Sequence, residues 1–163
     1  MKKSKYNGLM LNDDIAVYNE FLKDSIANSK ILVIGGAGSI GSSYIRNILN
    51  YRPGRLTVVD INENGLTELT RDLRSSHLLD YNPDYKSYPV DLVSETFDKI
   101  FYSQKWDVIA NFAAHKHVRS EKDGISVEAL IRNNVFGIIK LLKLCEQYPP
   151  KYFFSVSTDK AAN

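Results

Sequence analysis

The sequence predicts a doubly wound α/β domain, in which helices cover both faces of a parallel sheet. Five short strand-like segments recur along the chain, and the first, residues 30–34, is almost continuously apolar, as in a strand buried on both faces. Helix-like segments separate them, which implies parallel pairing through right-handed crossovers. A glycine-rich turn follows the first segment directly. We therefore expect the strand order 3-2-1-4-5.

An additional helix precedes this frame. Residues 1 to about 10 have the character of a loose tail. Asn12–Asp14 could cap a helix in which apolar residues recur at helical spacing, namely Ile15, Tyr18, Phe21, Leu22 and Ile26. We divide the chain into residues 1–29, the tail and helix, and residues 30–163, the alternating domain.

The elements of the alternating domain follow from their apolar runs and their breakers. Strands are expected at 30–34, 56–59, 85–90, 106–110 and 152–156. Helices are expected at 39–50, 64–75, 94–103 and 126–147. Pro53 and Gly54 end the first of these helices, and Pro149 and Pro150 end the last.

Composition excludes several classes of protein. The chain has 163 residues, 44% apolar, and a net charge of only +2 without a basic stripe, which argues against a nucleic-acid partner. The chain has one cysteine, Cys145, and can therefore form no internal disulfide. We interpret Cys145 as a small buried apolar residue. No apolar segment follows the basic start or is long enough to span a membrane, so we expect a cytoplasmic protein.

The strongest motif is the run Gly35-Gly36-Ala37-Gly38-Ser39-Ile40-Gly41, between the first strand and its helix. Gly35 and Gly38 would let the backbone turn and approach a pyrophosphate, and Gly41 would let the helix pack closely on the strand. The helix N-terminus would present free N–H groups to the phosphates. The alternative is a glycine-rich turn without a ligand.

Two acidic residues end the second and third strands. Asp60 lies about twenty residues after the last glycine, where a carboxylate binds the adenosine ribose and repels a 2′-phosphate. With no arginine following it, we expect NAD rather than NADP. The alternative is that Asp60 caps a helix, and the two roles could coexist. Asp91 could accept from the adenine amino group or serve as an N-cap, a role for which Ser94 competes.

Further polar residues follow the fourth and fifth strands, at the edge where ligands bind. Asn111–Ala114 offers small residues beside a cofactor, and His115-Lys116-His117 comes next. The two histidines could be metal ligands, but no cluster completes a site, so a loop near substrate phosphates is favoured. The segment from Ser155 to Lys160 carries a hydroxyl, an acid and an amine suited to proton transfer, or is simply a polar loop.

From about residue 30 onward, the chain resembles the extended short-chain dehydrogenase/reductases, a Rossmann-fold family. It is most similar to the polysaccharide-biosynthesis branch, which includes UDP-N-acetylglucosamine 4,6-dehydratases and nucleotide-sugar epimerases. The glycine run, Asp60 and Asp91 carry this resemblance together with the stretches 113–118, 133–137 and 157–163. The last of these, Ser-Thr-Asp-Lys-Ala-Ala-Asn, and the His-Lys-His-Val stretch are its most specific parts.

The resemblance implies a function and a set of site residues. The expected cofactor-binding residues are Gly35, Gly38, Ser39, Ile40, Gly41, Asp60, Asp91, Leu92, Ala113, Ala114, Asn134 and Ser155. Lys116 and His117 would contact a UDP-sugar substrate. Thr158 would hold the hydroxyl on carbon 4 of the sugar, Lys160 would take the proton from carbon 5, and Asp159 would protonate the hydroxide leaving carbon 6.

The implied reaction is a nucleotide-sugar 4,6-dehydration in surface polysaccharide biosynthesis. A 4-epimerase on the same frame and a non-catalytic dinucleotide-sensing module are the alternatives. Because the family's Tyr-x-x-x-Lys element and sugar domain would lie beyond Asn163, we expect a chain truncated after its fifth strand and inactive by itself. We also expect a homo-oligomer.

Overall fold

The computed structural model describes residues 9–114 and 124–156 of the chain. Five parallel strands form one sheet in the order β3-β2-β1-β4-β5, which confirms the predicted topology. The strands are β1 Lys30–Ile34, β2 Arg55–Asp60, β3 Asp84–Pro89, β4 Val108–Asn111 and β5 Tyr152–Ser155. Each lies within two residues of its predicted bounds. The strands β1, β2 and β4 are largely buried apolar runs, which mark a strand clearly, whereas β3 is partly buried and β5 is exposed.

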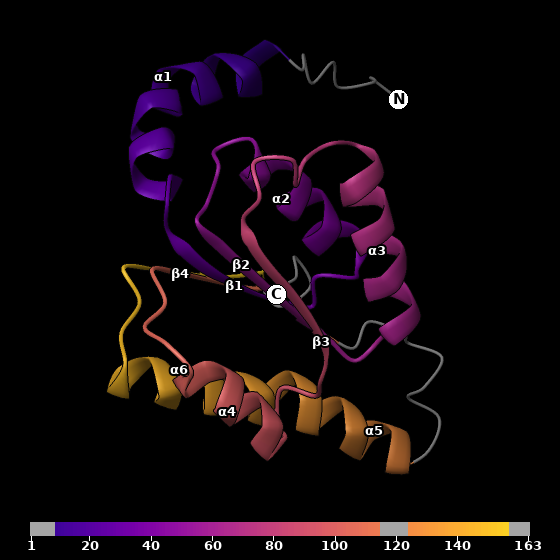
Figure 1. The fold of residues 1–163 in the computed structure, drawn as a ribbon. Helices are drawn as coiled ribbons and strands as arrows, with labels where there is room; N and C mark the ends of the chain where they lie inside the picture. The colour runs from indigo at the N-terminus through magenta and orange to yellow at the C-terminus, as the bar shows by residue number, and fades with distance from the viewer. Residues whose placement is uncertain (1–8, 115–123, 157–163) are drawn as a thin grey trace, which may run out of the picture.

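Helices cover both faces of this sheet. They are α1 Leu9–Ile26, α2 Ser39–Leu49, α3 Glu63–Ser75, α4 Glu95–Tyr102, α5 Gly124–Ile131 and α6 Gly137–Gln147. Figure 1 shows α1, α2 and α3 on one side of the sheet and α4, α5 and α6 on the other. Among the described residues, no helix combines the length and the apolar character needed to cross a membrane.

The central strand β1 supplies side chains to two separate cores. Ile31 and Val33 pack with α2 and α3 on one face, while Leu32 and Ile34 pack with α4 and α6 on the other. All four side chains are essentially inaccessible to solvent. Successive side chains of a strand point to opposite faces, so a strand covered on both faces reads as a continuous apolar run.

Two predicted helices differ from the structure. The helix expected at 126–147 is interrupted by a π-helical turn, η2 Arg132–Phe136, which separates α5 from α6. An extra residue per turn changes which side chains face the core, and the apolar run carries no signal for it. The added helix α1 begins at Leu9, so the prediction that Asn12–Asp14 cap it was wrong; these residues lie within it.

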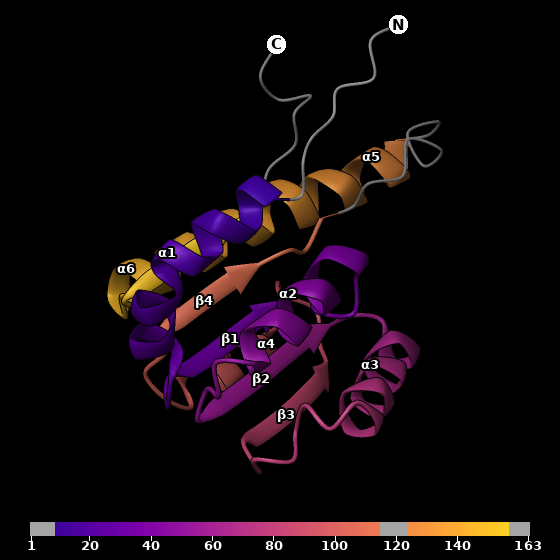
Figure 2. The same ribbon diagram turned by 90° about the horizontal axis from the view of Figure 1, so that it is seen from above.

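The C-terminal end of α1 attaches it to the domain. Ile26 is buried in the core that contains α2 and α3, and Leu22 packs against that core. Phe21 meets Tyr152 of β5 edge-on, with ring centroids 6.5 Å apart. Figure 2 shows α1 on the β4 side of the sheet and α3 on the β3 side. The added helix therefore extends one helical layer toward the β5 edge.

Candidate cofactor-binding site

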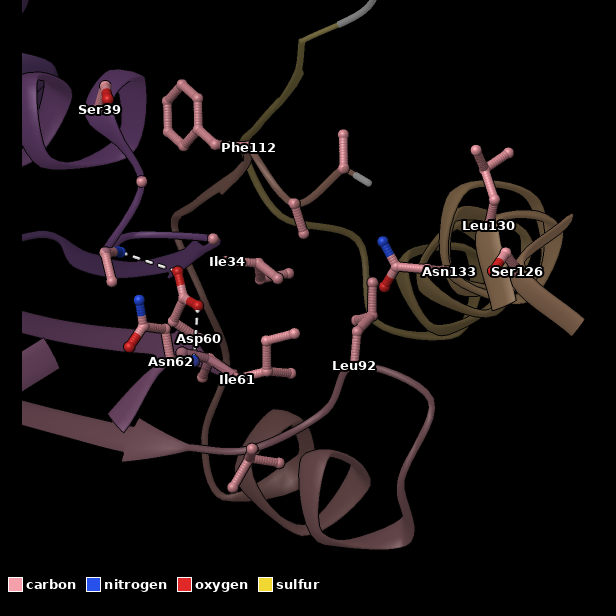
Figure 3. Close-up of a pocket in the computed structure, with 17 residues that line it drawn as sticks. Ile34, Ser39, Asp60, Ile61, Asn62, Leu92, Phe112, Ser126, Leu130 and Asn133 are labelled. Carbon is pink, nitrogen blue, oxygen red and sulfur yellow. Dashed lines mark hydrogen bonds between the residues drawn. The ribbon is translucent and has the colours of Figure 1, made fainter. Parts of the chain in front are cut away.

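A cavity of about 510 Å³ opens beyond the carboxyl ends of β1, β2, β3 and β4. In open parallel α/β sheets this edge is where ligands bind. Part of its wall comes from the glycine loop between β1 and α2, and the opposite wall comes from α5 and the π-helical turn. Figure 3 shows the glycine loop on one side and the helix that carries Ser126, Leu130 and Asn133 on the other, with Ile61 and Leu92 between them.

The glycine loop is shaped by close approaches of the backbone. Gly35 has φ of +75°, and a Cβ there would lie 2.5 Å from the amide nitrogen of Ala113. A Cβ on Gly41 would overlap the carbonyl oxygen of Gly35, so the start of α2 can pack against the loop only with glycine there. A Cβ on Gly38 would meet only the Gly35 oxygen at an ordinary 3.5 Å. The protein itself therefore leaves room at Gly38.

The N-terminus of α2 faces this room. Gly38 is the N-cap residue and offers no side-chain acceptor to the first turn of the helix. The hydrogen bond from the Ser42 N–H to the Gly38 carbonyl, at 2.8 Å, spans that first turn. The N–H groups ahead of it have no partner within the helix, and the helix dipole places partial positive charge on them. This arrangement suits an anionic phosphate.

Asp60 lies at the end of β2 and lines the cavity. Its Oδ2 accepts the Ala37 N–H at 2.9 Å, and its Oδ1 accepts the Asn62 N–H at 2.9 Å. The alternative reading of Asp60 as a helix cap was wrong. Asn62 caps α3 instead, because its Oδ1 accepts the Gly65 N–H at 3.0 Å.

Apolar side chains line one part of the cavity. Ile61, Val90, Leu92 and Leu130 line it, and Figure 3 shows the Asn133 side chain pointing toward Leu92. An apolar slot with a few polar groups is the usual character of a cofactor site.

The sequence analysis missed the wall contributed by the long helix. Ser126, Leu130 and Asn133 line the cavity and follow one another at helical spacing. This spacing was the available signal, but the sequence does not show that this face of the helix turns to the strand ends. Ile61 and Asn62 were also not selected, although they directly follow Asp60.

The structure brings seven of the predicted cofactor residues to the cavity: Gly35, Gly38, Ser39, Asp60, Leu92, Ala113 and Ala114. Outside its lining are Ile40, Gly41, Asp91, Asn134 and Ser155. Ser94 caps α4, since its Oγ accepts the Phe97 N–H at 3.2 Å, so the N-cap reading of Asp91 was wrong. The Asp91 carboxylate instead accepts the Val93 N–H at 2.9 Å.

Polar and aromatic contacts join the carboxyl ends of β4 and β5. The buried Asn111 donates from Nδ2 to the Ser155 Oγ at 3.2 Å and accepts the Ala113 N–H at 3.2 Å. The Phe112 ring packs at a tilt against Phe154 and Tyr44, with ring centroids 5.8 and 5.1 Å apart. Burial raises the pKa of Tyr44 to about 12, so its hydroxyl stays neutral.

The remaining predicted site residues lie outside the described residues. They are Lys116 and His117, which follow β4, and Thr158, Asp159 and Lys160, which follow β5. Their roles stay predictions. The chain reaches both stretches from strands whose ends meet at Asn111 and Ser155, on the edge where the cavity opens.

The described part of the chain shows neither a reactive cysteine nor a metal-binding cluster. Cys145 is half-buried beside the α4–α6 core, and burial raises the pKa of its thiol to about 11, so the thiolate is scarce at neutral pH. Across residues 9–114 and 124–156, no group of three or more His, Cys, Asp or Glu side chains could hold a metal ion.

The family model of the polysaccharide biosynthesis proteins matches residues 31–163. The chain belongs to this family. The match confirms the predicted resemblance to the polysaccharide-biosynthesis branch of the extended short-chain dehydrogenase/reductases. It begins at β1 and leaves α1 outside.

Relatives of this polysaccharide biosynthesis family member are longer proteins. An uncharacterized membrane protein of Methanocaldococcus jannaschii is 32% identical over 145 residues, 89% of this chain and 39% of the relative. A dTDP-glucose 4,6-dehydratase of Neisseria meningitidis is 32% identical over 141 residues, 80% of this chain and 38% of the relative. The chain thus spans about two fifths of these relatives' length.

A solved structure shares the fold. The Bordetella bronchiseptica enzyme WbmF, in complex with NAD+ and UDP, superposes with a TM-score of 0.59 at 17% identity, covering 80% of this chain and 36% of that one.

Proposed function

We propose that this chain is the NAD-binding part of a nucleotide-sugar 4,6-dehydratase that acts on UDP-N-acetylglucosamine or a similar UDP-sugar. The observation that carries the proposal is the convergence of the Gly35–Gly41 loop and Asp60 on one cavity at the carboxyl edge of the sheet. Membership of the polysaccharide biosynthesis family and similarity to a dTDP-glucose 4,6-dehydratase support the substrate class. A cytoplasmic location and a homo-oligomeric assembly belong to the same proposal.

In this proposal the dinucleotide occupies the cavity. The pyrophosphate would lie against the first turn of α2, in the room left at Gly38. The adenosine ribose would lie beside Asp60, and the adenine in the apolar slot near Ile61 and Leu92. WbmF, which shares the fold, was crystallised with NAD+ and UDP.

The side chains beside the ribose position favour NAD over NADP. Asp60 is a carboxylate, and Ile61 and Asn62 follow it in the cavity wall. A 2′-phosphate placed there would be repelled by the Asp60 carboxylate, because like charges repel strongly at short distance. Neither Ile61 nor Asn62 supplies a cation to offset that repulsion. We therefore propose NAD as the cofactor.

The catalytic roles extend this proposal to the segments after β4 and β5. NAD supplies the hydride acceptor for carbon 4 when it is bound. Thr158 would hold the hydroxyl on carbon 4, Lys160 would take the carbon 5 proton, and Asp159 would protonate the hydroxide that leaves carbon 6. Solvent deuterium at carbon 5 of the product would separate this dehydration from a 4-epimerisation, which leaves carbon 5 untouched.

Replacing Gly38 tests the cofactor site. Gly38→Val should abolish measurable NAD binding in calorimetry, because the added methyl groups fill the room next to the α2 N-terminus. Ser43→Val is the matched control, since it places the same side chain at an exposed position of the same helix. Unchanged NAD affinity in Gly38→Val, or equal losses in both variants, would contradict the proposed site.

A further inference from the structure

Asp60 connects three segments at the carboxyl end of β2. Figure 3 shows its carboxylate accepting the Ala37 N–H from the glycine loop and the Asn62 N–H from the start of α3, both at 2.9 Å. Its main-chain carbonyl accepts the Val90 N–H at 3.0 Å, just beyond β3. One residue therefore ties together the glycine loop, the N-terminus of α3 and the chain leaving β3.

The bond to Ala37 holds the middle of the glycine loop. At the start of that loop, the N–H groups of Gly35 and Gly36 point to the Val59 carbonyl at 2.8 and 3.4 Å. Ala37 comes next and immediately precedes Gly38, the N-cap of α2. Its partner is a carboxylate, and hydrogen bonds to ionised groups are about twice as strong as neutral ones. Asp60 thus determines where the chain enters α2.

This anchoring is compatible with a ligand contact by the same carboxylate. A carboxylate offers about four acceptor positions, and the two N–H groups of Ala37 and Asn62 use two of them. Asp60 also lines the cavity. Ribose hydroxyls could therefore bind to Asp60 without releasing the loop.

We propose that Asp60 is a positioning residue for the dinucleotide loop, in addition to contacting the ribose. By holding Ala37, it places Gly38 and the first turn of α2 in their phosphate-binding arrangement before the dinucleotide arrives. Arranging a site in advance lowers the ordering cost paid on binding. Part of the affinity for NAD then depends on Asp60 but not on the ribose. This inference rests on the proposed function.

The first test needs no ligand. In Asp60→Ala, solvent exchange of the Ala37 amide proton, followed by NMR, should become about tenfold faster or more, as expected when a bond to a charged group is lost. The Gly35 amide is the internal control, because its partner is the Val59 carbonyl. An unchanged Ala37 exchange rate would overturn the proposal.

The second test separates loop positioning from ribose contact. Calorimetry compares NAD with an analogue whose adenosine ribose lacks the 2′ and 3′ hydroxyls. If Asp60 acted only through the ribose, wild type and Asp60→Ala would bind the analogue equally well, and that result would overturn the proposal. We expect Asp60→Ala to bind the analogue about fivefold more weakly or worse.

Controls keep the outcomes distinct. Asp72→Ala removes the same charge from an exposed ion pair with Arg46 and should leave both affinities unchanged. If Asp60→Ala does not fold, Asp60→Asn keeps the size and one acceptor oxygen and should show the same directions of change. A wild type that binds neither NAD nor the analogue would overturn the proposed function and the loop-positioning role together. If wild type binds both and Asp60→Ala binds the analogue as tightly as wild type does, only the positioning role is overturned.

Discussion

Gly36 and Gly38 stand two residues apart in the glycine loop but have different surroundings. A Cβ on Gly36 would overlap Cγ1 of Val58 and lie 3.0 Å from Cδ1 of Ile45. Both of these side chains are completely buried, so neither can move aside. A Cβ on Gly38 would make only an ordinary contact. Gly36 is therefore required by the packed core, whereas core packing places no such demand on Gly38.

This difference predicts unequal effects on stability. Gly36→Ala should lower the free energy of unfolding by about 1–3 kcal/mol, the usual cost of overpacking a core. Gly38→Ala should change it by less than about 1 kcal/mol, since its φ of −70° suits any residue. Urea unfolding followed by circular dichroism measures both values. Equal losses in the two variants would contradict the assignment.

The sequence identified residues that line the cavity more readily than the contacts they make. Spacing from Gly41 to Asp60 identified Asp60, because the βαβ frame fixes where the second strand ends. It did not reveal that Asp60 binds the Ala37 and Asn62 amides. Those hydrogen bonds depend on the conformation of the loop, which the amino-acid sequence alone does not specify.

The added helix α1 is tied to the domain through one end. Ile26 is 9% exposed, whereas Tyr18, two turns earlier on the same face, is 60% exposed. Helical spacing predicted the helix, but of the apolar residues it selected, Leu22 and Ile26 pack against the core while Tyr18 and Phe21 are exposed. It could not predict how far the sheet extends beneath the helix, because that depends on where the chain turns between α1 and β1.

Two substitutions in α1 test this attachment. Ile26→Ala should lower the free energy of unfolding by about 2–4 kcal/mol, because it leaves a cavity in the core beneath α2 and α3. Tyr18→Ala should change it by no more than about 0.5 kcal/mol, as at most exposed positions. Thermal or urea unfolding measures the difference. An Ile26→Ala variant as stable as wild type would show that α1 does not share the core.

At the scale of the whole molecule, the sheet order and the edge that carries the site were both predictable. Right-handed crossovers and buried strands leave few alternatives to the order 3-2-1-4-5. The wall formed by Ser126, Leu130 and Asn133 was not predicted. It depends on how the long helix crosses the strand ends, and its π-helical turn has no signature in the apolar pattern.

The central claim is that NAD binds at the carboxyl edge of the sheet, against the glycine loop. The most direct measurement is a two-dimensional amide NMR titration of residues 1–163 with NAD. We expect the largest shifts at Gly38 and Ser39, at Ile61 and at Ala113, which line the cavity. No shifts at millimolar NAD would contradict the claim. So would shifts confined to Tyr102 and Tyr148, which line a separate cavity between the ends of α4 and α6.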